Sequence, residues 1–153
     1  MRVKNKAQKG QSFIELIAAL AVISIVLVVL VGLVTKSIAN TTFSRNKSLA
    51  TSYAEEAFEW LRGERDRGWS TSFYAQTANN WCIVSLNWST GGSHSGTCGS
   101  SEFISGTIFR RNLSFNRINA ATVDATITVS WSDSIGNHET TTTTTYTNWK
   151  GNP

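Results

Sequence analysis

Apolar residues form one long block near the N-terminus of the chain. From Leu16 to Val34 only Ser24 and Gly32 are not plainly apolar. A helix needs roughly 20 apolar residues to cross a bilayer. The block therefore predicts a membrane-spanning helix over residues 11–34, preceded by a short basic and polar segment, residues 1–10.

After the apolar block the pattern becomes amphipathic, and residues 35–68 contain no proline. Apolar residues recur at helical spacing and form one stripe, which comprises Ile38, Leu49, Tyr53, Ala57 and Leu61, with Ala50, Ala54 and Phe58 beside it. This spacing predicts that the helix continues, ends near Gly68 and packs one face on a soluble domain.

Residues 69–153 have the pattern of a small antiparallel sheet. Val123–Trp131 alternates apolar and polar positions, which predicts a half-buried strand. A turn follows, and the run Thr140–Thr145 predicts the antiparallel partner because Thr favours strands; a glycosylated, mucin-like stretch is the alternative. Weaker patterns predict a strand over Trp81–Trp88 and one or two strands over Phe103–Ile118. The predicted fold class is α+β, with a long N-terminal helix whose second half packs on the sheet.

The distribution of charge predicts the orientation of the helix. The first ten residues hold four of the 14 Lys and Arg and none of the 10 acidic residues, so basic and acidic residues balance in the remainder. A basic tail beside a span stays in the cytoplasm, which places the C-terminal domain outside. A balanced outer domain gives no support for nucleic-acid binding. Arg110, Arg111 and Arg117 are expected on a solvated strand face, with a local basic patch as the alternative.

The two cysteines, Cys82 and Cys98, both lie in this predicted outer domain. An even pair in an oxidising compartment predicts a disulfide, and two separate buried thiols are the alternative. We expect no metal site, because His94 and His138 show no ligand spacing. The sequence contains no paired nucleophile and base and no phosphate loop, so we expect no cofactor and no enzymatic activity.

The stretch Lys-Gly-Gln-Ser-Phe-Ile-Glu-Leu, residues 9–16, joins the basic segment to the apolar block. A secretory signal peptide has a shorter apolar region, of about 7–15 residues, with its cleavage site on the far side; residues 37–39 could imitate such a site. Neither a signal peptide nor a plain single-pass anchor explains Glu15. A carboxylate at the head of a span costs free energy unless a partner or the interface satisfies it.

This stretch resembles the signal of type IV prepilins and of the pseudopilins of type II secretion systems. Their shared motif is a basic leader that ends in Gly, five mature residues that end in Glu, and a hydrophobic helix. Gly10 matches the residue before the cut, Gln11 the first mature residue and Glu15 the fifth. The motif and the span cover residues 1–35, and the helix end at residues 54–69 is similar to that of minor pilins.

The resemblance implies that a prepilin peptidase removes a leader of residues 1–10 between Gly10 and Gln11 and methylates the new amine of Gln11. It implies that Glu15 acts in assembly. The implied function is that of a minor pilin or pseudopilin, assembled with other such subunits and an inner-membrane platform into an extracellular or periplasmic filament. A major pilin is the alternative within the family. A single-pass anchored adhesin or sugar-binding module, which the six Trp would suit, is the alternative outside it.

Two positions depart from the family pattern. The first mature residue is usually Phe and here is Gln11. This difference bears on how efficiently the peptidase cuts the chain and not on the resemblance itself. Many major pilins have a helix-bending Pro where this chain has Gly32. Gly lowers helix stability by about 1 kcal/mol relative to Ala, so Gly32 is a candidate point of helix flexibility. A close helix–helix contact is the alternative role.

Overall fold

The computed structural model describes residues 11–151 of the chain, with side chains from Phe13 onward. Its elements are α1 (Gln11–Arg67), η1 (Trp69–Phe73), η2 (Tyr74–Ala78), β1 (Trp81–Cys82), β2 (His94–Ser95), β3 (Arg110–Asn119), β4 (Thr122–Asp133) and β5 (Gly136–Thr147). The chain divides into two compact units, residues 1–41 and 42–153, and helix α1 contributes to both.

In the first unit the described part of α1 carries its apolar side chains on all sides. Every side chain from Phe13 to Ile38 is exposed, and the helix is long and apolar enough to cross a membrane. The hydroxyls of Ser24 and Thr35 donate to the carbonyls of Leu20 and Val31 at 2.7 and 3.0 Å. These hydroxyls therefore need no water, which suits a helix surrounded by lipid.

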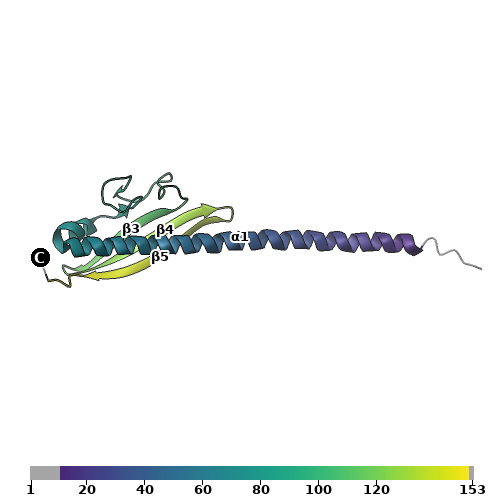
Figure 1. Ribbon diagram of the computed structural model, residues 1–153, viewed down its shortest axis with the longest axis horizontal. Helices are drawn as coiled ribbons and strands as arrows, with labels where there is room; N and C mark the ends of the chain where they lie inside the picture. The colour runs from purple at the N-terminus through teal and green to yellow at the C-terminus, as the bar shows by residue number, and fades with distance from the viewer. Residues whose placement is uncertain (1–10, 152–153) are drawn as a thin grey trace, which may run out of the picture. The chain divides into compact units, whose positions relative to one another are not determined.

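In the second unit the C-terminal part of α1 lies along strands β3, β4 and β5 (Figure 1) and buries one stripe against them. The buried residues of this stripe are Ala50, Ala54, Ala57, Phe58 and Leu61. Three of the five are alanines, whose small side chains allow the helix backbone to approach the sheet closely. The predicted stripe was wrong at Leu49 and Ile38, which are 38% and 62% exposed.

The strands of the described residues form one antiparallel sheet in the order β2-β1-β3-β4-β5. Strand β4 alternates as predicted: Val123, Ala125, Ile127, Val129 and Trp131 are buried, and the polar residues between them are only partly buried. The Thr-rich run pairs with β4 inside β5, as predicted. The tight turn between them ends at Gly136, whose φ of 144° favours glycine. The predicted α+β fold class is confirmed.

The prediction for Trp81–Trp88 was wrong beyond β1, because the ladder ends at Cys82. The next residues form an irregular loop in which the Ser85 N–H donates to the hydroxyl of Ser93 at 3.0 Å. Because this backbone N–H donates to a side chain of its own loop, it is not available to pair with a neighbouring strand. In Phe103–Ile118 the strand begins only at Arg110, and the residues before it are also loop.

Candidate functional site

The residues of the predicted signal lie at the start of helix α1. Gly10 lies outside the described residues. Gln11 is the first residue of α1, and Glu15 follows one turn later with an exposed side chain. Positions four apart share one face of a helix. The backbone amine that cleavage before Gln11 would free is therefore one turn from the Glu15 carboxylate.

Gly32 lies within the apolar part of α1. A Cβ added there would meet no atom within 4 Å, so nothing inside the chain requires glycine at this position. Both roles considered for Gly32, as a point of helix flexibility and as a contact with another helix, remain predictions.

The two cysteines are joined in the second unit. Cys82, in β1, is fully buried, and Cys98 reaches it from the loop after β2. Their disulfide has a Cα–Cα distance of 4.7 Å. It joins β1 to the loop after β2 and closes the segment between them into a covalent loop. The backbone N–H of Cys98 also donates to the side-chain oxygen of Asn112 on β3, at 2.7 Å.

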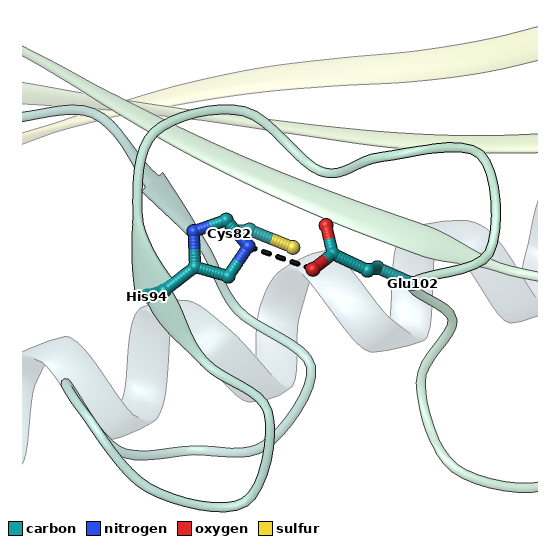
Figure 2. Close-up of side chains that lie close together, drawn as sticks. All are labelled: Cys82, His94 and Glu102. Atoms are coloured by element: carbon teal, nitrogen blue, oxygen red, sulfur yellow. Dashed lines mark hydrogen bonds and ion pairs between the residues drawn. The ribbon is translucent and has the colours of Figure 1, made fainter.

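Two further side chains, His94 and Glu102, lie beside Cys82 (Figure 2). Nε2 of His94 lies 2.9 Å from Oε1 of Glu102, and Nδ1 of His94 lies 2.9 Å from the Ser95 carbonyl. The potential ligand atoms of Cys82, His94 and Glu102 all lie within 4.8 Å of one another. This arrangement contains three types of metal-binding side chain, although we expected no metal site from the sequence.

Hydrogen bonds shift the pKa values of both His94 and Glu102. The carbonyl of Ser95, and then the carboxylate of Glu102, raise the pKa of His94. The N–H of Gly99, and then His94, lower the pKa of Glu102. The two side chains form an ion pair when His94 is protonated, and 42% and 34% of their side-chain surfaces are exposed. While the disulfide is intact, neither sulfur is a thiolate, so the cluster lacks the strongest ligands for a soft metal.

The three arginines considered as a basic patch are dispersed. Arg111 is buried in contact with the helix, Arg117 lies 4.3 Å over the ring of Tyr74, and Arg110 lies 5.8 Å over the ring of Phe103. The prediction of a solvated strand face was therefore wrong for Arg111. Successive residues of a strand point to opposite faces, which separates Arg110 from Arg111.

A cavity of about 140 Å³ lies where the end of α1 meets the C-terminal segment; its lining includes Arg65, Asp66, Trp69, Trp149 and Lys150. Its polar groups bond mainly to one another: Trp149 Nε1 donates to the Asp66 carboxylate at 3.2 Å and Lys150 Nζ to the Asp66 carbonyl at 2.8 Å. Trp149 is 65% exposed, whereas Trp69, Trp81 and Trp131 are buried. Trp60 and Trp88 are partly buried and pack on each other with ring centroids 4.6 Å apart, so five of the six tryptophans contribute to the core or its edge.

Residues 5–31 match the model of the prokaryotic N-terminal methylation motif. The match contains Gly10, Gln11 and Glu15 and most of the apolar block. No curated protein and no solved structure gives a significant match to the chain.

Proposed function

Because residues 5–31 are the signal that type IV prepilins and pseudopilins share, we propose that this chain is a minor pilin or pseudopilin, a structural subunit of a type IV pilus or type II secretion-like filament. The observation that carries the proposal is the matched motif followed by a helix that is long and apolar enough to cross a membrane. The fold, a long helix packed on an antiparallel sheet, agrees with that of a pilin.

Each of the four segments of the chain has its own role in the proposed subunit. Residues 1–10 are the leader, and a prepilin peptidase cuts between Gly10 and Gln11 and methylates Gln11. Residues 11–34 cross the inner membrane with the N-terminus in the cytoplasm, as the basic leader favours. Residues 35–68 are the soluble half of the helix, and residues 69–153 form the outer sheet domain. After cleavage the subunit leaves the membrane and joins the filament.

Glu15 is the proposed assembly residue. After cleavage, Gln11 bears a positive amine one helical turn from the Glu15 carboxylate. In the anchored subunit, water at the membrane interface solvates both charges. In a filament the neighbouring helices exclude this water, and each charge then needs a partner. Pairing Glu15 with the Gln11 amine of an adjacent subunit would satisfy both charges and set the axial stagger between subunits.

The test replaces Glu15 and follows the subunit into filaments. We expect Glu15→Ala to be cleaved and inserted normally but to be depleted from sheared filaments, because removal of one member of a buried pair costs about 3–5 kcal/mol. Glu55→Ala is the matched control, since Glu55 is an exposed glutamate of the same helix in the second unit. Normal incorporation of Glu15→Ala would remove this mechanism.

Two other functions give different outcomes in the same preparation. A major pilin would be the most abundant protein of the sheared filaments, whereas a minor subunit would be scarce. A membrane-anchored adhesin or sugar-binding module that does not polymerise would be missing from the filaments and would stay in the membrane fraction.

A further inference from the structure

Backbone pairing places His94 beside Cys82. Strands β1 and β2 are antiparallel, and Cys82 is directly opposite His94 in their register. Side chains at directly opposed positions lie on the same face of a sheet about 4.5–5.5 Å apart at Cβ. Cys98 completes the group, because its sulfur is bonded to that of Cys82 at 2.06 Å. The Cys82 sulfur, the His94 imidazole and the Glu102 carboxylate are therefore close together (Figure 2).

The two ligands that are not sulfur are already oriented by outer hydrogen bonds. Nδ1 of His94 lies 2.9 Å from the Ser95 carbonyl, which fixes the proton on Nδ1 when the ring is neutral and directs the lone pair of Nε2 toward the cluster. The N–H of Gly99 donates to Oε2 of Glu102 at 2.5 Å, and Oε1 faces His94. Metal-binding histidines and carboxylates in proteins usually have such outer bonds.

We propose that the reduced chain binds one Zn²⁺ through Cys82, Cys98, His94 and Glu102. Two thiolates, an imidazole and a carboxylate form an ordinary tetrahedral zinc set. Bond lengths of roughly 2.0–2.3 Å place the ligand atoms of such a site about 3.4–3.8 Å apart. Since the atoms of Cys82, His94 and Glu102 lie within 4.8 Å of one another, these three need only small movements, whereas the two sulfurs, 2.06 Å apart in the disulfide, must move apart once that bond is broken.

The disulfide and the metal exclude each other. A dithiol or phosphine reductant supplies two electrons, and two protons are taken up, so that the S–S bond breaks and two thiols form. Zinc then displaces one proton from each thiol, which passes to water, and binds the lone pair on Nε2 of the neutral His94 ring. A low-molecular-weight disulfide then accepts two electrons by thiol–disulfide exchange, which returns both sulfurs to the S–S bond and releases the metal. The site therefore belongs to a chain that has not been oxidised, and it is independent of filament assembly.

The test uses the full chain in detergent, reduced with a phosphine and titrated with Co²⁺ as a spectroscopic probe for zinc. We expect one Co²⁺ per chain, with a thiolate charge-transfer band and the visible bands of a tetrahedral site, and displacement of the cobalt by Zn²⁺. The oxidised chain should show none of these bands. Cys82→Ser should abolish them.

Two histidine variants separate this site from adventitious binding. His94→Ala should weaken Co²⁺ binding by about 10-fold or more, because loss of outer-shell partners alone costs 10–100-fold. His138→Ala is the matched control, since His138 lies on β5 and pairs with Asp133; it should bind as the wild type does. Equal affinities of wild type and His94→Ala would overturn the proposal.

Reduction of the disulfide could partly unfold the sheet domain. Circular dichroism during the titration measures its strand content and keeps the proposal testable in that case. Metal binding to a site that exists only in the folded state drives folding, so Zn²⁺ should restore the strand signal of a partly unfolded reduced chain. A reduced chain that fails to refold with Zn²⁺, or that gives no tetrahedral cobalt spectrum, counts against the site.

Discussion

Arg111 is the least exposed charged side chain of the described residues, with 2% of its surface accessible. Its guanidinium donates to the carbonyl of Ile83 at 3.2 Å, and to the carbonyl of Tyr53 and the Glu56 carboxylate at 2.9 and 3.1 Å. Burial lowers the pKa of Arg111, and the Glu56 charge opposes this effect. One side chain thereby links β3, the loop after β1 and helix α1.

We expect Arg111→Met to lower the free energy of unfolding of the sheet domain by about 1–3 kcal/mol, because two backbone carbonyls lose their donor. Glu56→Gln should have a much smaller effect. Half of the Glu56 side chain is exposed, so water screens its charge and the ion pair contributes little to stability. Urea unfolding followed by Trp fluorescence measures both variants. If Glu56→Gln costs as much as Arg111→Met, the ion pair and not the carbonyl bonds provides the stability.

Tyr146 is buried in β5, and its hydroxyl donates to the Phe58 carbonyl of α1 at 2.9 Å. Desolvation raises the pKa of Tyr146 well above its ordinary value. The unfolded chain therefore ionises at lower pH than the folded one. The contribution of this side chain to stability is fully present below pH 10 and is lost as the pH rises further.

Tyr146→Phe should cost about 0.5–1.5 kcal/mol at pH 7, from the lost hydrogen bond. The difference in unfolding free energy between wild type and Tyr146→Phe should then shrink above pH 10, because only the wild type loses the contribution of this hydroxyl. Urea titrations of both proteins at pH 7 and at about pH 10.5 to 11 measure this change, which is the difference in their unfolding free energies at each pH. A constant difference across that range would contradict the raised pKa.

At the scale of elements, the disulfide stabilises a part of the sheet that has few other constraints. Strands β1 and β2 each contain two residues, and the bond joins positions 16 residues apart. A loop of this length gives roughly 3 kcal/mol on the chain-entropy account of disulfides. The effect arises mainly because the bond restricts the unfolded chain.

Replacing both cysteines, as Cys82→Ser with Cys98→Ser, should therefore lower the free energy of unfolding by roughly 3 kcal/mol. The measurement is urea unfolding with a chelator in the buffer, so that no metal stabilises any sample. Wild type with its disulfide intact, in the same chelator, is the reference. A loss below about 1 kcal/mol would show that the loop is already ordered without the bond.

At the scale of the whole molecule, residues 5–31 match the N-terminal methylation motif, and the proposed function makes the chain a substrate of a prepilin peptidase. A peptidase that requires a small residue before the cut should reject a branched side chain there. We expect Gly10→Val to remain a full-length precursor held in the membrane. Mass spectrometry of the N-terminus should find Gln11, methylated, in the wild type and Met1 in the variant.

Gln8→Val is the control for this experiment, because it adds the same side chain two residues before Gly10 in the same leader. Its mature N-terminus should be that of the wild type. A wild-type N-terminus at Met1, or one just after Ala39, would refute processing after Gly10 and would favour a plain anchor or a secretory signal peptide.

The sequence alone predicted the features that depend on local pattern. The apolar block, the signal around Glu15, the alternation of Val123–Trp131 and the Thr-rich partner strand are all readable along the chain, because helical and strand periods and membrane spans are properties of consecutive residues. The α+β fold class was predicted from these patterns. The weaker strand over Trp81–Trp88 did not form as predicted, because Ser85 and Ser93 bond to each other within the loop.

Only the tertiary structure decided which distant residues meet. Arg111 is separated by 55 residues from Glu56, and no pattern near either one predicts their contact. His94 joins Cys82 through the register of β1 and β2, and Glu102 joins them from the loop that follows Cys98. Such clusters depend on long-range pairing, because side chains far apart in sequence become neighbours only when the backbone between them has folded.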